Sequence, residues 1–207
     1  EGAYGVFVCG STGECTSMTV TERKSVLEAW VKAVAGRILV IAHVGGTCQA
    51  DCIELARHAT ELGVNAIGAV APFYLKPGSV EELVAFYKPI AAACAPLPFY
   101  AYHIPSMTGI NLLMIEFLKK GSKEIPNLNG IKFTSNNFME MIECIRFDGG
   151  RFDILNGFDE MLLCGMAVGA RGGVGSTYNY SLRTYQKIYD AFMAGDLEQA
   201  RAAQQES

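Results

Sequence analysis

The chain has 207 residues, of which 50% are apolar and 18% are charged, and its net charge is -4. This length and apolar content are enough for a sizeable core, and we expect one domain over residues 1–207. The acidic balance and the lack of a Lys/Arg cluster argue against nucleic acid or an anionic membrane as the main partner. No apolar run is long enough to span a bilayer, and no secretory signal opens the chain.

The cysteines indicate a reducing compartment. Seven cysteines are scattered, mostly in apolar segments, which is typical of reduced thiols rather than of a disulfide framework. We therefore expect a cytoplasmic protein. Cys48 and Cys52 lie four apart on a predicted helix, but no histidine stands at a ligand-like spacing, so we expect no metal site. The other cysteines that we expect to be small core residues are Cys9, Cys94, Cys144 and Cys164.

Short β-branched or aromatic runs alternate with amphipathic segments along the chain. The runs predict strands at 6–8, 38–42, 66–71, 99–103, 130–133, 152–155 and, weakly, 172–174. Thr19 with Glu22, and Ser79 with Glu82, have the spacing of helix capping boxes. Pro89 should end or kink the second of these helices. The remaining helices are predicted at 47–62, 111–120, 137–145, 159–168 and 182–194, and residues 195–207 resemble the start of a further, truncated helix.

Seven strictly alternating βα units predict a parallel sheet, either doubly wound or closed as a (β/α)₈ barrel. Polar and glycine-rich residues follow each strand, as in a barrel whose loops all contribute to one site, and no G-x-G-x-x-G turn indicates a Rossmann sheet. We therefore predict a (β/α)₈ TIM barrel. The strand count is one short of eight and the chain opens on Glu1, so we expect the first βα unit and the C-terminal helices to be missing.

One lysine interrupts an otherwise apolar predicted strand. Lys132 lies between Ile131 and Phe133, where a charged ammonium would be costly to desolvate. A lysine at the C-terminal part of a barrel strand can form a Schiff base with a carbonyl substrate, and burial would favour the neutral amine that this requires. Snorkelling to the strand end, or pairing with a carboxylate, is the structural alternative.

The loops after the other strands offer matching groups. Ser11 and Thr12 supply hydroxyls and backbone amides that suit a carboxylate or a phosphate. Tyr102 places a phenol at a strand end, where it could carry a proton. Asp159 and Glu160 could accept hydrogen bonds from sugar hydroxyls. Each group also has an ordinary structural alternative. The first loop could be a turn and helix cap, the tyrosine a core residue with a satisfied hydroxyl, and the two acids the usual carboxylates at a helix N-terminus.

Together these motifs resemble the N-acetylneuraminate lyase and dihydrodipicolinate synthase superfamily. The motifs that carry the resemblance are GSTGE at 10–14, YHIPSMTG at 102–109, GIK at 130–132, GFDE at 157–160 and GSTYN at 175–179. The resemblance implies a class I, lysine-dependent aldolase on a (β/α)₈ barrel, usually a homotetramer, that needs no metal or other cofactor. Met107 stands where dihydrodipicolinate synthases carry an arginine, and the other motifs look like the sialic acid lyase branch. We therefore expect reversible cleavage of N-acetylneuraminate to pyruvate and N-acetylmannosamine.

The resemblance also implies roles for individual residues. Lys132 would attack the keto carbon, and Tyr102 would carry the proton of the C4 hydroxyl. Ser11 and Thr12 would hold the carboxylate. Residues expected to recognise the hydroxylated tail and N-acetyl side of the sugar are Thr134, Gly157, Asp159, Glu160 and Ser176. Tyr74 is a further candidate, since related aldolases place a tyrosine near the site from this loop, and packing under the loop is its alternative.

Two other functions are compatible with the sequence. One is a pyruvate-dependent aldolase that acts on a different keto-sugar acid. The other is a non-catalytic binding or regulatory barrel, because a missing strand would leave unpaired edges and loosen the site.

Overall fold

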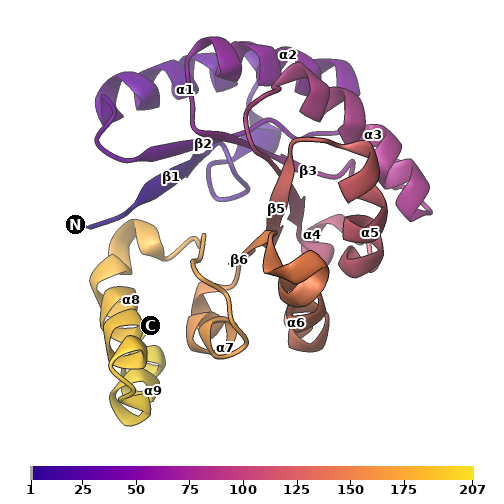
Figure 1. Cartoon of the computed structure of the whole chain (residues 1–207). Helices are drawn as coiled ribbons and strands as arrows, with labels where there is room; N and C mark the ends of the chain where they lie inside the picture. The colour runs from indigo at the N-terminus through magenta and orange to yellow at the C-terminus, as the bar shows by residue number, and fades with distance from the viewer. Residues whose placement is uncertain (1) are drawn as a thin grey trace.

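Six parallel strands form a curved sheet in a computed structural model that describes residues 2–207 (Figure 1). Their spatial order is their sequence order, from β1 to β6. The strands are β1 (Gly5–Val8), β2 (Leu39–His43), β3 (Ala66–Val70), β4 (Phe99–His103), β5 (Leu128–Phe133) and β6 (Asp153–Asn156). Because each strand pairs in parallel with the next, their carboxyl ends meet at one rim, as the predicted TIM barrel requires. The sheet is an open part of such a barrel, with six strands in place of eight, and we refer to it as the half-barrel.

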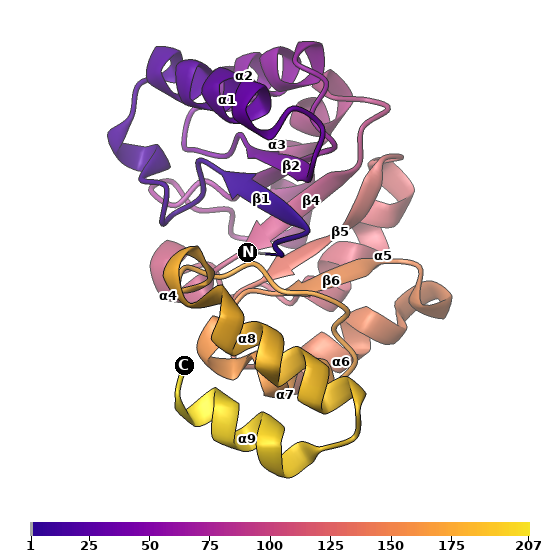
Figure 2. The same cartoon turned by 90° about the vertical axis from the view of Figure 1, so that its left-hand side faces the viewer.

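Helices connect the strands and cover the outer face of the sheet, as Figures 1 and 2 show. They are α1 (Val20–Val34), α2 (Gln49–Glu61), α3 (Val80–Ala93), α4 (Pro105–Thr108), α5 (Met114–Glu124), α6 (Phe138–Arg146) and α7 (Leu162–Ala167). A hairpin of α8 (Tyr178–Met193) and α9 (Leu197–Gln205) ends the chain. This last helix agrees with the helical start predicted at 195–207. Among residues 2–207, no helix is both long enough and apolar enough to cross a bilayer.

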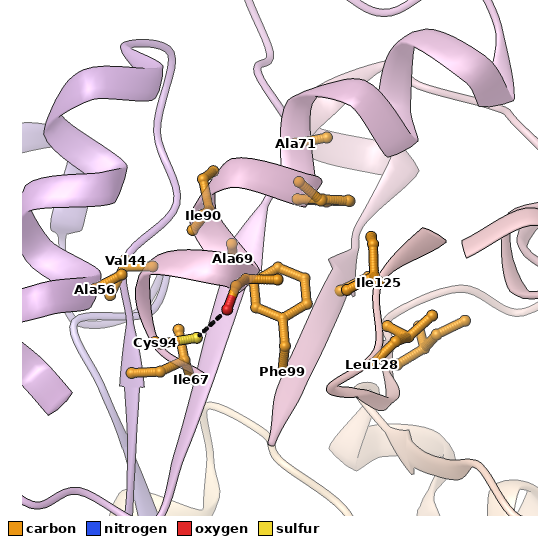
Figure 3. Packing of buried hydrophobic residues seen from close by; sticks show 14 of the residues in the cluster. Val44, Ala56, Ile67, Ala69, Ala71, Ile90, Cys94, Phe99, Ile125 and Leu128 are labelled. Carbon is orange, nitrogen blue, oxygen red and sulfur yellow. Dashed lines mark hydrogen bonds between the residues drawn. The ribbon is translucent and has the colours of Figure 1, made fainter. Parts of the chain in front are cut away.

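The main core lies between the sheet and its covering helices (Figure 3). β3 is buried along its whole length, which explains why its residues read as one continuous apolar run. Ile67 of β3, Ile90 of α3 and Phe99 of β4 are each fully buried in this layer. Cys94 packs beside them, with its thiol donating to the carbonyl oxygen of Ala91 at 3.2 Å. Burial of this kind contributes roughly 1.5–3 kcal/mol per large side chain to the stability of the fold.

Two helix starts follow the local signals. Thr19 accepts a hydrogen bond from the Glu22 amide while the Glu22 carboxylate accepts from the Thr19 amide, so the predicted capping box at α1 is confirmed. Ser79 likewise accepts from the Glu82 amide at α3. Pro89 does not end α3, which continues to Ala93.

The predicted seventh strand at 172–174 is wrong, because the structure has only a single β-bridge there, between Asn156 and Gly173. Two hydrogen bonds join the segments, from the Asn156 amide to the Gly172 carbonyl and from the Val174 amide to the Asn156 carbonyl. Glycines add no side chain to pack, and no further strand pairs with this segment within residues 2–207. The seventh βα unit is therefore a short extended segment that follows β6.

Other helix boundaries also differ from the predicted ones. The helix predicted from Asn111 begins at Met114, and the one predicted over 159–168 is a 3₁₀ turn at Asp159–Met161 followed by α7. Cys164, predicted to be a core residue, is exposed on α7, whereas Cys9, Cys94 and Cys144 are buried as predicted. All seven cysteines are free thiols, and no metal-binding cluster of His, Cys, Asp or Glu occurs among residues 2–207.

Candidate active site

Lys132 projects from β5 beside β4, close to the carboxyl end of the sheet. Only 6% of the residue is exposed. Its ammonium nitrogen Nζ lies 3.7 Å from the centroid of the Tyr102 ring and 5.6 Å from that of Phe7. Nζ donates a hydrogen bond to Thr134 Oγ1 at 3.2 Å. The environment of the amine is therefore aromatic on one side and singly hydrogen-bonded on the other.

This environment changes the acidity of the lysine. Burial disfavours the ammonium and lowers the pKa of Lys132 from 10.5 to about 7, while the negative charge of Asp159 acts in the opposite direction. At neutral pH a large fraction of the side chain is thus a free amine with an unshared electron pair. From the sequence we expected burial to favour the neutral amine, and the lowered pKa of Lys132 agrees with this expectation.

Tyr102, on β4, is the aromatic neighbour of the amine. Its hydroxyl lies 3.3 Å from Ser11 Oγ, in the loop that follows β1. Burial raises the pKa of Tyr102, and the hydroxyls of Ser11 and Thr134 oppose that shift. The phenol therefore keeps its proton at neutral pH and can pass it only within a hydrogen-bonded chain. Ser11, Tyr102, Lys132 and Thr134 form one contiguous group in the structure.

Gly157 is required where the loop after β6 meets Thr134. A Cβ atom on Gly157 would lie only 1.9 Å from Thr134 Oγ1. The Gly157 amide also donates to the Phe133 carbonyl at 2.8 Å, which holds the loop against the end of β5. Any side chain here would displace Thr134 and, through it, Lys132. The glycine of the GFDE motif thus makes room for the hydroxyl beside the lysine.

Asp159 and Glu160 differ in their surroundings although they are adjacent. Asp159 is buried, and its Oδ2 accepts hydrogen bonds from the amide and the hydroxyl of Thr177. The Thr177 hydroxyl also contacts the Tyr185 hydroxyl at 2.5 Å. Glu160 is exposed. Asp159 therefore anchors the GSTYN loop, whereas Glu160 is free to meet a solute.

Thr12 and Ser176 connect two loops through their hydroxyl groups. Their hydroxyl oxygens are 2.5 Å apart, which links the loop after β1 to the loop before α8. Both residues are exposed, so a bound molecule has access to either hydroxyl. The contact brings together two predicted residues that are 164 positions apart in sequence.

Tyr74, in the loop after β3, and Met107, in the short helix α4, are open to solvent, at 83% and 68% exposure. Tyr74 is thus not packed under its loop, which was the alternative to a role near the site. Two surface hollows of about 500 and 290 Å³ lie away from Lys132, one between α3 and α5 and one beside the start of β2. The first is lined by charges that pair with one another, such as Lys120 with Glu81.

Sequence reasoning missed the two rings that enclose Tyr102. Phe7 of β1 and His43 of β2 lie 5.8 Å from the Tyr102 ring, centroid to centroid, both edge-on. The position of His43 at the last residue of its strand, beside a polar loop, was the available signal. Without the strand register, nothing indicated that its ring faces Tyr102.

The sequence profile of the Dihydrodipicolinate synthetase family matches residues 1–207. The chain belongs to this family, a lysine-dependent group of aldolases, as its motifs predicted. Within it, the chain resembles the N-acetylneuraminate lyase branch. It is 44% identical to N-acetylneuraminate lyase B of Xenopus laevis over 96% of this chain and 75% of that protein. It is 40% identical to the N-acetylneuraminate lyase of Homo sapiens over 97% of this chain and 63% of that protein.

Solved structures agree with the fold. The Proteus mirabilis N-acetylneuraminate lyase superposes with a TM-score of 0.95 at 40% identity, covering 98% of this chain and 68% of that one. Dihydrodipicolinate synthase of Aquifex aeolicus superposes with a TM-score of 0.90 at 32% identity, covering 99% and 69%. The chain thus spans roughly two thirds of the length of most of these relatives.

Proposed function

We propose that this chain carries class I aldolase chemistry and cleaves N-acetylneuraminate reversibly to pyruvate and N-acetylmannosamine. The observation that supports this best is Lys132, a buried amine whose pKa is about 7, which is hydrogen-bonded to the Thr134 hydroxyl and lies against the Tyr102 ring. A structural lysine in such a place would be expected to form an ion pair or to reach solvent. Lys132 does neither.

The chemistry follows from the amine. Lys132 Nζ attacks the keto carbon of the open-chain sugar acid, and loss of water leaves a protonated imine. The C4 hydroxyl then gives up its proton, its oxygen forms a carbonyl, and the C3–C4 bond breaks with its electron pair moving into the iminium. The enamine that remains takes up a proton at C3. Hydrolysis returns the free lysine and releases pyruvate.

Tyr102 and Ser11 are the groups placed to move the proton of the C4 hydroxyl. Their hydroxyls are within 3.3 Å of each other, and the Tyr102 ring lies against the amine. We propose Tyr102 as the proton carrier and the hydroxyls of Ser11 and Thr12 as the carboxylate site. In the reverse direction the same chain returns the proton to the aldehyde oxygen of the sugar.

We propose that the sugar tail and its N-acetyl side are recognised by Thr134, Gly157, Glu160 and Ser176. Asp159 belongs to the same group, but its carboxylate already accepts two hydrogen bonds from Thr177. It contributes by shaping that loop and by the charge that it adds near Lys132.

Met107 favours a neutral sugar tail over an acidic aldehyde. It is 68% exposed and has no charge, so it cannot pair with a second carboxylate at the mouth of the site. The similarity to several N-acetylneuraminate lyases, at 38–45% identity, supports the same choice. The resemblance also supports a cytoplasmic homotetramer.

Borohydride trapping tests the chemistry, and product analysis tests the substrate. Reduction in the presence of pyruvate should leave a pyruvyl adduct on the peptide that carries Lys132, and Lys132→Ala should abolish it. N-acetylmannosamine should then be condensed with pyruvate faster than other aldehydes. Preference for a different aldehyde would identify another pyruvate-dependent aldolase. A folded protein with no adduct would contradict aldolase chemistry and favour a binding barrel.

A further inference from the structure

His43 connects three strand ends through one buried ring. It is the last residue of β2 and is 3% exposed. Its Nδ1 lies 2.7 Å from the carbonyl oxygen of Cys9, just after β1, and its Nε2 accepts a hydrogen bond from the Val70 amide of β3 at 3.1 Å. Because Nε2 must accept, the ring proton has to be on Nδ1, where it is donated to Cys9.

The Cys9 contact holds the start of the loop that carries Ser11 and Thr12, which we call the carboxylate loop because these residues are the proposed carboxylate site. Cys9 has a φ of 57°, a left-handed conformation that non-glycine residues adopt only when their surroundings enforce it. Gly10 and Ser11 follow directly, and Ser11 Oγ is the partner of the Tyr102 hydroxyl. A fixed carbonyl at Cys9 therefore controls where the Ser11 hydroxyl lies.

The same ring supports Tyr102. The His43 ring meets the Tyr102 ring edge-on, at 5.8 Å between centroids and an angle of 85°. Lys132 Nζ lies against the Tyr102 ring at 3.7 Å from its centroid. His43 thus contacts both the Tyr102 ring, which lies beside the amine, and the loop that carries Ser11.

Arg23 holds the backbone of His43 in place. Its Nη2 donates to the His43 carbonyl at 2.8 Å and its Nη1 to the Gly45 carbonyl at 3.1 Å. Burial, with the positive charges of Arg23 and Lys132, lowers the pKa of His43 to about 3, so the ring stays neutral across the working pH range. A ring that never titrates keeps one tautomer and one set of partners.

We propose that His43 is a positioning residue for the 2-oxo acid: through Cys9 and Tyr102 it sets the carboxylate loop and the phenol relative to Lys132. The proposal rests on the proposed aldolase function. It assigns His43 no contact with substrate and no proton transfer. It requires the link to Cys9 more than the link to Val70, because only the first leads into the Ser11 loop.

Two variants separate these links. In His43→Asn the side-chain amide can still occupy the place of Nδ1 and donate to Cys9, whereas His43→Gln can keep an acceptor for Val70 but extends past Cys9. His58→Gln is the matched control, since His58 lies on α2 and pairs with Glu28 on α1. The readout is borohydride trapping of pyruvate on Lys132, measured as the half-saturating pyruvate concentration and the trapped fraction at saturation.

We expect His43→Gln to raise the half-saturating pyruvate concentration about tenfold, His43→Asn at most about threefold, and His58→Gln not at all. A purely structural role would lower the trapped fraction without moving the half-saturating concentration. Unchanged half-saturation in both His43 variants, or equal increases in both, would overturn the proposal. Failure of the unaltered protein to trap pyruvate would instead overturn the proposed function, and the proposal about His43 with it.

Discussion

Polar residues of the half-barrel are buried on its strands but exposed on the loops that follow the strands. We call the first region the wall and the second the rim. On the wall, Lys132, Tyr102 and Thr134 are buried on or just after β4 and β5. On the rim, Thr12, Glu160 and Ser176 are exposed on loops. Regular strands hold the first group at fixed spacings, whereas loops carry the second. The proposed reacting groups, Lys132 and Tyr102, therefore lie where the surroundings can shift a pKa, and the three rim groups proposed to bind substrate lie where water still screens them.

This difference assigns different tasks to the two regions. Desolvation at the wall turns a lysine into a nucleophile, which a rim lysine would not become. Hydroxyls and a carboxylate at the rim can bind a hydroxylated sugar and release it again. Substitutions on the wall should therefore change the chemistry, and substitutions on the rim should change apparent affinity.

Removal of the amine should have the largest effect. We expect Lys132→Ala to reduce pyruvate trapping and aldol cleavage by at least about a thousandfold, because no other group can form the imine. Lys123→Ala, on the exposed face of α5, should leave both unchanged. Initial rates and peptide mass spectrometry measure the effect. Residual trapping on a different lysine would break the distinction between wall and rim.

Replacing the lysine by an apolar side chain should stabilise the wall. The pKa of Lys132 is about 7 when folded and about 10.4 when unfolded. The cost of burying the ammonium is therefore full below pH 7 and disappears as the pH rises to about 10.4. We expect Lys132→Met to raise the free energy of unfolding by about 2–4 kcal/mol at pH 6 and by much less at pH 10. Denaturant unfolding at the two pH values, with Lys123→Met as control, checks this. A pH-independent difference would contradict the account.

A side chain at Gly157, in the loop after β6, should displace Thr134, which belongs to the wall. Because a Cβ on Gly157 would lie 1.9 Å from Thr134 Oγ1, Gly157→Ala must displace Thr134. We expect a loss of about 1–3 kcal/mol in stability and about a tenfold slower trapping of pyruvate. Gly78→Ala is the matched control, since its Cβ would lie 3.7 Å from the nearest atom, a flexible Glu82 oxygen. Equal behaviour of the two variants would refute the role given to Gly157.

Loss of a rim hydroxyl should have the smallest effect. Ser176→Ala breaks the 2.5 Å contact with Thr12, but both groups are exposed and water can replace it. We expect at most about a threefold rise in KM for the sugar acid, with kcat and pyruvate trapping unchanged. Steady-state kinetics measures this, and a fall in kcat beyond tenfold would place Ser176 with the wall residues.

The sequence predicted the wall better than the rim, for physical reasons. Lys132 and Tyr102 stood out because each interrupts or ends an apolar strand, and strand periodicity is a local property. The capping box at Thr19 and the side-chain cap at Ser79 are equally local. The role of His43 depends on register, because its ring reaches Cys9, 34 positions away, and Val70, 27 positions away. Only the parallel pairing of β1, β2 and β3 brings these residues together.

Tertiary contacts also act at two helices whose ends differ from those expected from the sequence, since α3 continues past Pro89 and α5 begins after Asn111. Gln49 of α2 donates to the Phe86 carbonyl within α3, so a contact from the neighbouring helix holds α3 close to Pro89. The helix α5 begins at Met114, where the Glu140 carboxylate of α6 accepts from the Met114 amide, a cap supplied from another helix. Neither partner is visible in the local sequence.

The acidity of Lys132 tests the central claim most directly. Trace labelling of amines with acetic anhydride over pH 5–11, followed by peptide mass spectrometry, gives the titration of each lysine, with the exposed Lys123 as internal reference. We expect the labelling of Lys132 to rise with an inflection near pH 7, and prior treatment with pyruvate and borohydride to prevent that labelling. An inflection near the ordinary lysine value of about 10.4 would show that the wall does not activate the amine.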